Sequence, residues 1–298
     1  MTTLILPLPG SEALANNLLE LLSAQHCACV TRVFPDGEHY VRVETPVAGR
    51  DVVIVAGLAH PDDKLVLLYL LARTLSDLGA RRILLVAPYL PYMRQDSVFQ
   101  PGEGRSAEYI SSWLSGFIDG LVTVDPHLHR IGSLKQVFSV PAEAVHAAQV
   151  IAHWIGENVT RPMIVGPDEE SRQWSKEVAQ AIEAPLVVLH KTRHGDRDVT
   201  ILTPDLPSDT DYTPVLVDDI ISTGQTLVAA IRQLRNAGFP APVCVGVHAL
   251  FTQDVIDQLR SAGAERVVSC NTVPHASNAI DTSRPIAAAL RRMLAADV

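Results

Sequence analysis

Short apolar runs alternate with segments of helical periodicity along most of the chain. Strand-like runs occupy residues 52–56, 83–87, 121–124, 162–165, 186–189, 215–217, 243–247 and 267–269. Segments with helical spacing occupy residues 63–78, 106–117, 142–157, 169–182, 254–262 and 284–296, and a further helix begins after Gly224. This alternation predicts an α/β fold in which mainly parallel strands are flanked by helices.

The two halves of the chain follow the same plan, which predicts two similar domains. We place the boundary near Pro141, so that residues 1–141 form the first domain and residues 142–283 the second. Residues 284–298 are predicted to form a helix that packs across the domains. Glycines and charges interrupt the pattern at residues 95–104 and 193–198, and such tracts are typical of mobile loops over a ligand site.

A strand that ends in two acids provides the strongest chemical signal. The run from Pro214 to Thr226 contains an apolar strand, then Asp218 and Asp219, then a hydroxyl-rich turn with Gly224 that opens a helix. Backbone N–H groups and the helix dipole favour an anion at such a turn, and paired acids bind sugar hydroxyls or a divalent cation. The pattern predicts a site for a phosphorylated sugar, at the edge where α/β sheets bind ligands.

The helix dipole alone is too weak to make this turn a phosphate site. It contributes about 0.3 to 2 kcal/mol toward an anion, whereas each charge-assisted hydrogen bond adds roughly 1.5 to 3 kcal/mol. The donors for such bonds are the backbone of residues 223–226 and the hydroxyls of Ser222, Thr223 and Thr226. The competing interpretation is that the acids are solvated and the turn is an ordinary helix cap.

Three further segments place candidate residues after predicted strands. Asp168 follows a strand as Asp218 does, so it is a candidate to accept a hydrogen bond from a sugar hydroxyl. Arg94 can bind phosphate with two hydrogen bonds, and Gln95 can bind a base or a phosphate. The alternative for this segment is a solvated pair of Arg94 with Asp96. His127 is a candidate to contact phosphate that carries a metal ion.

Lys191 and Arg193 bring two cations to the end of another predicted strand. If the tract after them closes on a substrate, this pair can neutralise charge on a group in transfer. A solvated basic loop is the alternative interpretation.

Composition excludes several classes of protein. The chain has 298 residues, of which 47% are hydrophobic and 19% charged, and its formal charge of -9 argues against binding to nucleic acid through phosphates. The sequence has no apolar run of about 18 residues and no signal-peptide pattern at its start, so we expect a cytoplasmic protein. The four cysteines are too few and too scattered for a disulfide framework.

Taken together, these segments resemble the ribose-phosphate pyrophosphokinases, or PRPP synthetases, over nearly the whole chain and in the expected order. The loop pattern is most similar to the archaeal branch of that family. The segments that carry the resemblance are Phe34-Pro35-Asp36-Gly37-Glu38, Arg94-Gln95-Asp96, Asp125-Pro126-His127, Pro167-Asp168, Lys191-Thr192-Arg193 and the run from Val217 to Gly224.

The resemblance implies two type I phosphoribosyltransferase-like domains and transfer of the β,γ-diphosphate of ATP to the 1-hydroxyl of ribose 5-phosphate, with Mg²⁺ required. It further implies a homo-oligomer in which the loop from Phe34 to Glu38 lies at a subunit interface. Lys191 and Arg193 would be catalytic. The implied ATP site consists of Phe34, Asp36, Glu38, Arg94, Gln95, Asp96 and His127. The implied ribose 5-phosphate site consists of Asp168, Asp218, Asp219, Ser222, Thr223, Gly224, Gln225 and Thr226, and His127 and Asp168 would contact the metal.

Three residues depart from the family pattern, and two other functions stay open. Pro126 replaces an aliphatic residue, and Glu169 and Glu170 stand where small residues often follow the aspartate. A type I phosphoribosyltransferase would use the same turn after Asp219 without the segments of the first half. A noncatalytic regulatory subunit of the family would be expected to lack Lys191 and Arg193.

Overall fold

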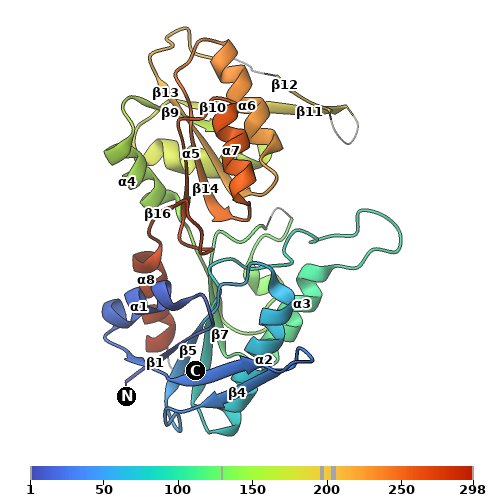
Figure 1. The fold of residues 1–298 in the computed structure, drawn as a ribbon, viewed down its shortest axis with the longest axis vertical. Coiled ribbons are helices and arrows are strands. Elements are labelled where there is room, and N and C mark those ends of the chain that lie inside the picture. The colour runs from blue at the N-terminus through green and yellow to red at the C-terminus, as the bar shows by residue number, and fades with distance from the viewer. Residues whose placement is uncertain (1, 129, 195–197, 203–205, 297–298) are drawn as a thin grey trace. The chain divides into compact units, whose positions relative to one another are not determined.

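The chain forms two compact units, each built around its own sheet (Figure 1). The first unit comprises residues 1–145 and 283–298, and the second comprises residues 146–282. The computed structural model describes residues 2–128, 130–194, 198–202 and 206–296, with the backbone alone for residue 170 and for residues 190–202 within these ranges. The functional division into domains at residues 141 and 283 stays a prediction.

The first unit has a six-stranded parallel sheet in the order β2-β1-β5-β6-β7-β8, and β3 pairs with β4 in a separate antiparallel hairpin. Its strands are β1 (Leu4–Pro7), β2 (Gln25–His26), β3 (Cys29–Val33), β4 (His39–Val43), β5 (Asp51–Val55), β6 (Arg82–Val86), β7 (Gly120–Val124) and β8 (Ala142–Val145). Its helices are α1 (Glu12–Leu22), α2 (Pro61–Asp77), α3 (Ser106–Ser115), the short 3₁₀ turn η1 (Leu134–Gln136) and α8 (Ser283–Ala295).

The second unit has a six-stranded parallel sheet in the order β10-β9-β13-β14-β15-β16 and an antiparallel pair, β11 with β12. Its strands are β9 (Pro162–Gly166), β10 (Leu186–Val188), β11 (His190–His194), β12 (Asp198–Leu202), β13 (Thr213–Ile221), β14 (Val243–Ala249), β15 (Arg266–Cys270) and β16 (Asn278–Ile280). Its helices are α4 (Ala148–Asn158), the 3₁₀ turn η2 (Glu169–Ser171), α5 (Arg172–Ala181), α6 (Gln225–Asn236) and α7 (Gln253–Ser261).

The two sheets share one strand order, as the repeated pattern of the sequence predicted. In each unit the second strand is the edge, the first lies beside it, and the remaining four follow in chain order. An antiparallel pair stands between the second and third sheet strands of each unit along the chain: β3–β4 in the first and β11–β12 in the second. The predicted loop at residues 193–198 therefore begins and ends in strands, and residues 195–197 lie outside the described part of the chain.

Both faces of each sheet are buried, which explains why the strands read as continuous apolar runs. All five residues of β5 are buried. Val52 and Ile54 share a core cluster with Leu68 and Leu71 of α2, while α1 and α8 cover the opposite face (Figure 1). In the second unit, Leu216 shares a cluster with residues of α6 and α7 on one face, and α4 and α5 cover the other (Figure 1).

The prediction of one helix over residues 142–157 was wrong at its start. Residues 142–145 form β8, which pairs with β7 in the register Leu121↔Ala142, and α4 begins only at Ala148. The segment Ala-Glu-Ala-Val has good helix propensity, but completing the sheet edge outweighs this weak preference. The predicted helix over residues 169–182 divides into η2 and α5.

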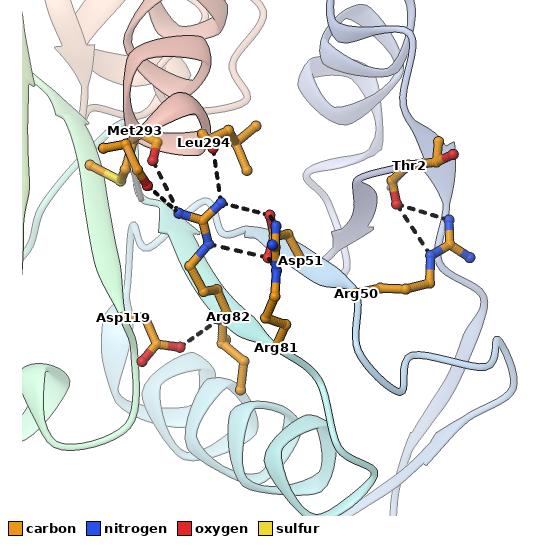
Figure 2. A network of polar contacts seen from close by, with 10 residues as sticks. Thr2, Arg50, Asp51, Arg81, Arg82, Asp119, Met293 and Leu294 are labelled. Atoms are coloured by element: carbon orange, nitrogen blue, oxygen red, sulfur yellow. Dashed lines mark hydrogen bonds and ion pairs between the residues drawn. The ribbon is translucent and has the colours of Figure 1, made fainter. Parts of the chain in front are cut away.

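A buried carboxylate anchors the C-terminal helix to the first sheet (Figure 2). Asp51 accepts hydrogen bonds from Arg81 at 2.5 Å and from Arg82 at 2.7 Å. Arg82 also donates to the carbonyl oxygens of Leu294, at 3.0 Å, and Ala296, at 2.9 Å. Such a cation satisfies the carbonyl groups that the last turn of a helix leaves unpaired, and it interacts favourably with the helix dipole.

The two guanidinium groups change the acidity of Asp51. Burial is the largest single influence and opposes ionisation, but hydrogen bonds and charges from Arg81 and Arg82 together outweigh it and lower the pKa of Asp51 to about 2. The unfolded-state pKa of an aspartate is about 3.9. The folded state therefore gains stability that is present above about pH 4 and is lost as the pH falls through about 2.

We predict that Asp51→Asn destabilises the first unit by about 2 kcal/mol at pH 7, because two cations lose their anionic partner. The measurement is urea unfolding followed by the fluorescence of Trp113 in a background with Trp154→Phe and Trp174→Phe. The difference from the parent should shrink between about pH 4 and about pH 2. Glu44→Gln is the control, since its pair with Arg42 is exposed and should contribute less than about 1 kcal/mol. A difference independent of pH would contradict the assignment.

Candidate functional site

Three carboxylates meet at the C-terminal edge of the second sheet. β9 and β13 are parallel neighbours, with Val165 opposite Leu216, so the residues that follow each strand lie at the same edge. Asp168 comes two residues after β9, and Asp218 and Asp219 lie near the end of β13. The negative charges of Asp219 and Asp168 both act on Asp218. The predicted grouping of these acids is therefore present within the second unit.

This grouping makes Asp218 harder to ionise than an ordinary aspartate. Burial, the charges of Asp219 and Asp168, and a hydrogen bond between the carboxyl groups of Asp218 and Asp219 raise its pKa well above the ordinary value. The same field reaches Cys244 in β14, because burial and the charge of Asp218 raise the pKa of that thiol to about 12. The edge thus favours ligands that bring hydroxyl donors or a cation.

Local hydrogen bonds fix the orientation of the acids. The backbone N–H of Asp219 donates to Asp218 Oδ1 at 3.0 Å, and the N–H of Ile220 donates to Asp219 Oδ1 at 2.7 Å. Asp168 caps η2, where its Oδ1 accepts from the N–H of Ser171 at 3.3 Å. Gly166 permits this turn, since a Cβ there would lie 2.6 Å from Ser171 Oγ. Carboxylates held in this way lose little further freedom when they bind a ligand.

The turn after Asp219 offers backbone donors. Among the described residues, no group accepts a hydrogen bond from the backbone N–H of Ser222, Thr223, Gly224 or Gln225. Gly224 precedes α6 with φ 70°, a left-handed conformation that suits glycine. A Cβ at this position would lie 2.7 Å from Val255 Cγ1. A run of N–H groups at a helix N-terminus is the arrangement that binds phosphate groups.

The equivalent turn of the first unit is built differently. It joins β5 to α2 and also places a left-handed residue, His60 with φ 52°, before the helix. There Lys64 Nζ donates to the carbonyl oxygens of Gly57, at 2.8 Å, and Ala59, at 2.7 Å. The N–H of Gly57 donates to Ser11 Oγ at 2.9 Å. Carbonyl oxygens gathered around the chain's own lysine do not attract an anion, so the predicted phosphate turn belongs to the second unit.

The candidates between β6 and α3 lie on one braced loop of the first unit. Asp96 is buried and accepts from the backbone N–H of Arg130 at 3.0 Å and from its guanidinium at 3.1 Å. The alternative interpretation of this segment, a solvated pair of Arg94 with Asp96, is not what the structure shows, since Asp96 is buried and bonded to Arg130. The carbonyl of Gln95 accepts from the N–H of Ala107 at 3.2 Å. Arg94 is exposed on this loop.

His127 follows β7, at the C-terminal edge of the first sheet. Asp125, two residues before it, is buried with φ 34°, and its N–H donates to the carbonyl of Val145 at 2.9 Å. This strained residue turns the chain sharply at the end of β7, and strain of this kind is common at functional sites. His127 itself is partly buried.

Phe34, Asp36 and Glu38 form the turn of the β3–β4 hairpin. The N–H of Phe34 donates to the carbonyl of Glu38 at 2.7 Å, and the N–H of Glu38 donates to Asp36 Oδ1 at 3.2 Å. The guanidinium of Arg32 lies 4.8 Å from the ring centroid of Phe34, which is 37% exposed. The hairpin turn therefore presents an aromatic ring and two acids to its surroundings.

Lys191 and Arg193 both lie in β11, where only the backbone is described. They pair with Ile201 and Val199 of β12. Because their spacing is two, they share one face of this strand pair. Their assignment to the transferred group stays a prediction.

The fold and the edge that carries the acids and the N–H donors define an α/β protein with a candidate site for a phosphorylated ligand, and comparisons identify the family. Residues 3–116 match the N-terminal domain of ribose phosphate pyrophosphokinase, and residues 133–285 match the phosphoribosyl transferase domain. The ribose-phosphate pyrophosphokinase of Methanopyrus kandleri is 34% identical, with 94% of this chain and 96% of the relative covered. The enzyme of the same name from Sulfolobus acidocaldarius is 33% identical, with 91% and 94% covered.

The chain belongs to the ribose-phosphate pyrophosphokinase family. The crystal structure of phosphoribosylpyrophosphate synthetase from Mycobacterium smegmatis has the same fold, with a TM-score of 0.86 over 99% of both chains at 23% identity. The resemblance seen in the sequence is thereby confirmed, as is the fold class. Among the described residues, no helix has the length and apolar character needed to span a membrane.

Sequence reasoning missed two features of these edges. Lys64 sits in an amphipathic helix like any solvated lysine, and only the return of α2 toward the end of β5 brings its ammonium to the carbonyl groups of Gly57 and Ala59. Burial of that ammonium lowers its pKa. No sequence pattern indicated the loop that holds His275, because the polar residues that bond to it come from β15 and β16.

We predict that Gly224→Ala destabilises the second unit by about 1 to 3 kcal/mol, because alanine is strained at φ 70° and its Cβ meets Val255. The measurement is urea unfolding followed by Trp154 and Trp174 in a Trp113→Phe background. Gly156→Ala is the matched control: this glycine lies inside α4 with no side chain closer than 4.0 Å, so alanine should leave stability unchanged or raise it by up to about 1 kcal/mol. Equal effects of the two substitutions would contradict the role of the turn.

Proposed function

We propose that this protein is a ribose-phosphate diphosphokinase, which transfers the β,γ-diphosphate of ATP to the 1-hydroxyl of ribose 5-phosphate and forms PRPP and AMP. In this reaction the 1-oxygen forms a bond to the β-phosphorus, the bond from that phosphorus to the α,β-bridging oxygen breaks, and the hydroxyl proton is released. Family membership supports this activity.

The observation that carries the proposal is the pairing of acids and N–H donors at one edge of the second sheet. Asp218 and Asp219 lie near the end of the same strand that leads into the turn with Gly224. A pentose phosphate has hydroxyls at one end and an anion at the other, so it matches both groups at once. We assign its hydroxyls to Asp168, Asp218 and Asp219, and its phosphate to Ser222, Thr223, Gly224, Gln225 and Thr226.

The ATP side of the proposal rests on the first unit. Arg94 is exposed and can bind phosphate with its planar guanidinium, and Gln95 lies next to it on the braced loop. Asp96 holds this loop through Arg130, so its contribution to ATP binding is to position the loop. We assign His127 to the metal-bound phosphates.

The carboxylate oxygens at the C-terminal edge of the second unit's sheet are ligands that suit Mg²⁺. Within the described part of the chain, no three His, Cys, Asp or Glu side chains are grouped so that they could hold a metal ion by themselves. Mg²⁺ characteristically binds one or two carboxylates together with substrate phosphates and water. Asp168 and His127 are the residues that we assign to it. When bound, the ion would neutralise charge on the triphosphate and on the transferred group.

The hairpin that carries Phe34, Asp36 and Glu38 is assigned to the nucleotide site of a neighbouring subunit, which makes the protein a homo-oligomer. The exposed ring of Phe34 gives this assignment a physical basis, because an aromatic face can stack on a base. We assign no nucleic acid or membrane partner, and we expect a cytoplasmic location.

Two alternatives are less well supported. A type I phosphoribosyltransferase does not need the first unit, yet residues 3–116 match the pyrophosphokinase N-terminal domain. A noncatalytic regulatory subunit does not need Lys191 and Arg193, yet the chain retains both.

The direct test is an assay with ATP, Mg²⁺ and ribose 5-phosphate that follows AMP and PRPP. We expect equal amounts of both products. Formation of neither product, over a range of phosphate and metal concentrations, would rule out the diphosphokinase. PRPP consumption with a nucleobase as acceptor would instead favour a phosphoribosyltransferase.

We predict that Lys191→Ala lowers kcat about 100- to 1000-fold and leaves the affinity for ribose 5-phosphate within a few fold of the parent. The physical reason is that a cation on the transferred group acts mainly in the transition state. Steady-state kinetics and calorimetric titration with ribose 5-phosphate separate the two effects. Lys176→Ala on α5 is the control and should change neither. A loss confined to affinity would contradict the transition-state role of Lys191.

A further inference from the structure

A hydrogen-bonded loop follows β15 at the same edge of the second sheet as the carboxylates. It comprises residues 271–277 and returns the chain to β16, which pairs in parallel with β15. Because β13, β14 and β15 are parallel neighbours, this loop lies on the side of β13 away from β9. It therefore lies on the side of the phosphate turn opposite to Asp168, with β14 and the loop after β14 between it and the turn.

Polar side chains from both flanking strands brace this loop. Asn271 Oδ1 accepts from the N–H of Thr282 at 2.8 Å, and Thr272 Oγ1 donates to the carbonyl of Val247 at 2.6 Å. The N–H of His275 donates to Asn278 Oδ1 at 3.0 Å, and the N–H of Ser269 donates to the carbonyl of Ser277 at 2.9 Å. None of these bonds uses the His275 imidazole, so the loop has ample support without it.

A directed chain of hydrogen bonds sets the tautomer of His275. The backbone N–H of Ser277 donates to His275 Nδ1 at 3.1 Å, so this nitrogen is an acceptor. The hydroxyl of Ser277, at 2.7 Å, therefore also donates to it. Ser277 Oγ then accepts from Ser269 Oγ at 2.7 Å, which in turn accepts from Asn278 Nδ2 at 2.9 Å. In the neutral imidazole the proton must be on Nε2.

The Nε2–H group of this partly buried histidine donates to no other residue in the described ranges. It is therefore available to a ligand, while the bonds at Nδ1 hold the ring in place. Side chains held by such supporting bonds, with one donor left over, are what a preorganised binding site requires.

Two contacts connect His275 to the phosphate turn. The N–H of Leu250, in the loop after β14, donates to the carbonyl of Ile221, the residue before Ser222, at 3.0 Å. The next residue, Phe251, is buried and lies edge to face with His275, with ring centroids 4.5 Å apart. The loops after β13, β14 and β15 thus form a continuous row, with the phosphate turn at one end and the imidazole at the other.

We propose that His275 is a further binding residue for the pentose phosphate, and that its Nε2–H donates to the phosphate group held by the turn at residues 222–226. This inference rests on the proposed function and assigns the histidine to the phosphate rather than to the sugar hydroxyls, which are assigned to Asp218 and Asp219 on β13 and to Asp168 after β9. The phosphate does not react, so the bond serves ground state and transition state alike.

The test measures the affinity for ribose 5-phosphate by calorimetric titration in the presence of Mg²⁺. It also measures KM and kcat of the diphosphokinase reaction. For His275→Ala we expect about a 10-fold loss of ribose 5-phosphate affinity, or about 1.4 kcal/mol, with kcat and the KM for ATP unchanged. His275→Gln retains a terminal N–H donor and should remain within about threefold of the parent. If His275→Ala does not fold, as judged by its melting temperature, His275→Leu replaces it.

Two controls separate a phosphate contact from a sugar contact and from the nonspecific effect of removing a histidine. His153→Ala removes an exposed histidine from α4, where its partner is the exposed Glu157, and it should change no parameter. Unphosphorylated ribose, tested as a competitive inhibitor, should bind His275→Ala and the parent equally well. Weaker ribose inhibition in the variant would overturn the phosphate assignment in favour of a sugar contact.

The remaining outcomes decide between this inference and the function on which it rests. An active parent with unchanged ribose 5-phosphate affinity in His275→Ala overturns the inference and leaves the diphosphokinase standing. An equal loss in the Ala and Gln variants, accompanied by lower melting temperatures, shows a structural histidine and also overturns it. A parent that binds ribose 5-phosphate through His275 but forms no AMP supports the inference while the proposed reaction fails. A parent that binds no ribose 5-phosphate overturns both.

Discussion

The parallel pairing of β9 with β13 is the constraint on which the site depends. It brings Asp168 beside Asp218 and Asp219, where burial and like charge oppose ionisation of Asp218. The strands below offset this cost: Val165, Leu216 and Val217 are fully buried, and each such side chain contributes about 1.5 to 3 kcal/mol. Apolar burial thus holds together acids that would otherwise separate, and a ligand with hydroxyls or a cation relieves the remaining repulsion.

The repeated fold shows which differences matter for function. Both units have the same strand order, and both place a left-handed residue before the helix that follows the third sheet strand. In the second unit the backbone N–H groups of residues 222–225 have no acceptor among the described residues, whereas in the first unit Lys64 binds the carbonyl oxygens of the turn. One architecture therefore produces a turn with open N–H donors or a turn closed by a lysine, according to a few side chains. For this reason the fold alone does not show which turn is suited to an anion.

Local patterns in the sequence were sufficient for the fold class and for the candidate residues that follow one another on β13 and in the turn after it. Apolar runs predicted the central strands because both faces of each sheet are buried, and Asp218, Asp219 and Gly224 lie on one continuous segment. The start of α4 was wrong because pairing with β7 converts residues 142–145 to a strand. The imidazole of His275 escaped notice for a related reason: Ser269 and Asn278, which orient it, belong to strands on either side of its loop. Contacts made across strands leave no periodic signal.

The two hairpins provide the clearest case of divergence at one topological position. β3–β4 and β11–β12 both stand between the second and third sheet strands of their units, yet one has Phe34 and two acids at its turn and the other has Lys191 and Arg193 on one strand. Residues 32–38 are exposed, so substitution there disturbs no core. Such positions can change their side chains at little cost in stability, whereas the position of Asp218 is fixed because it lies within β13 of the sheet. The shared framework therefore keeps the acids at a fixed place on the sheet edge, while the exposed turn of the β3–β4 hairpin is free to vary.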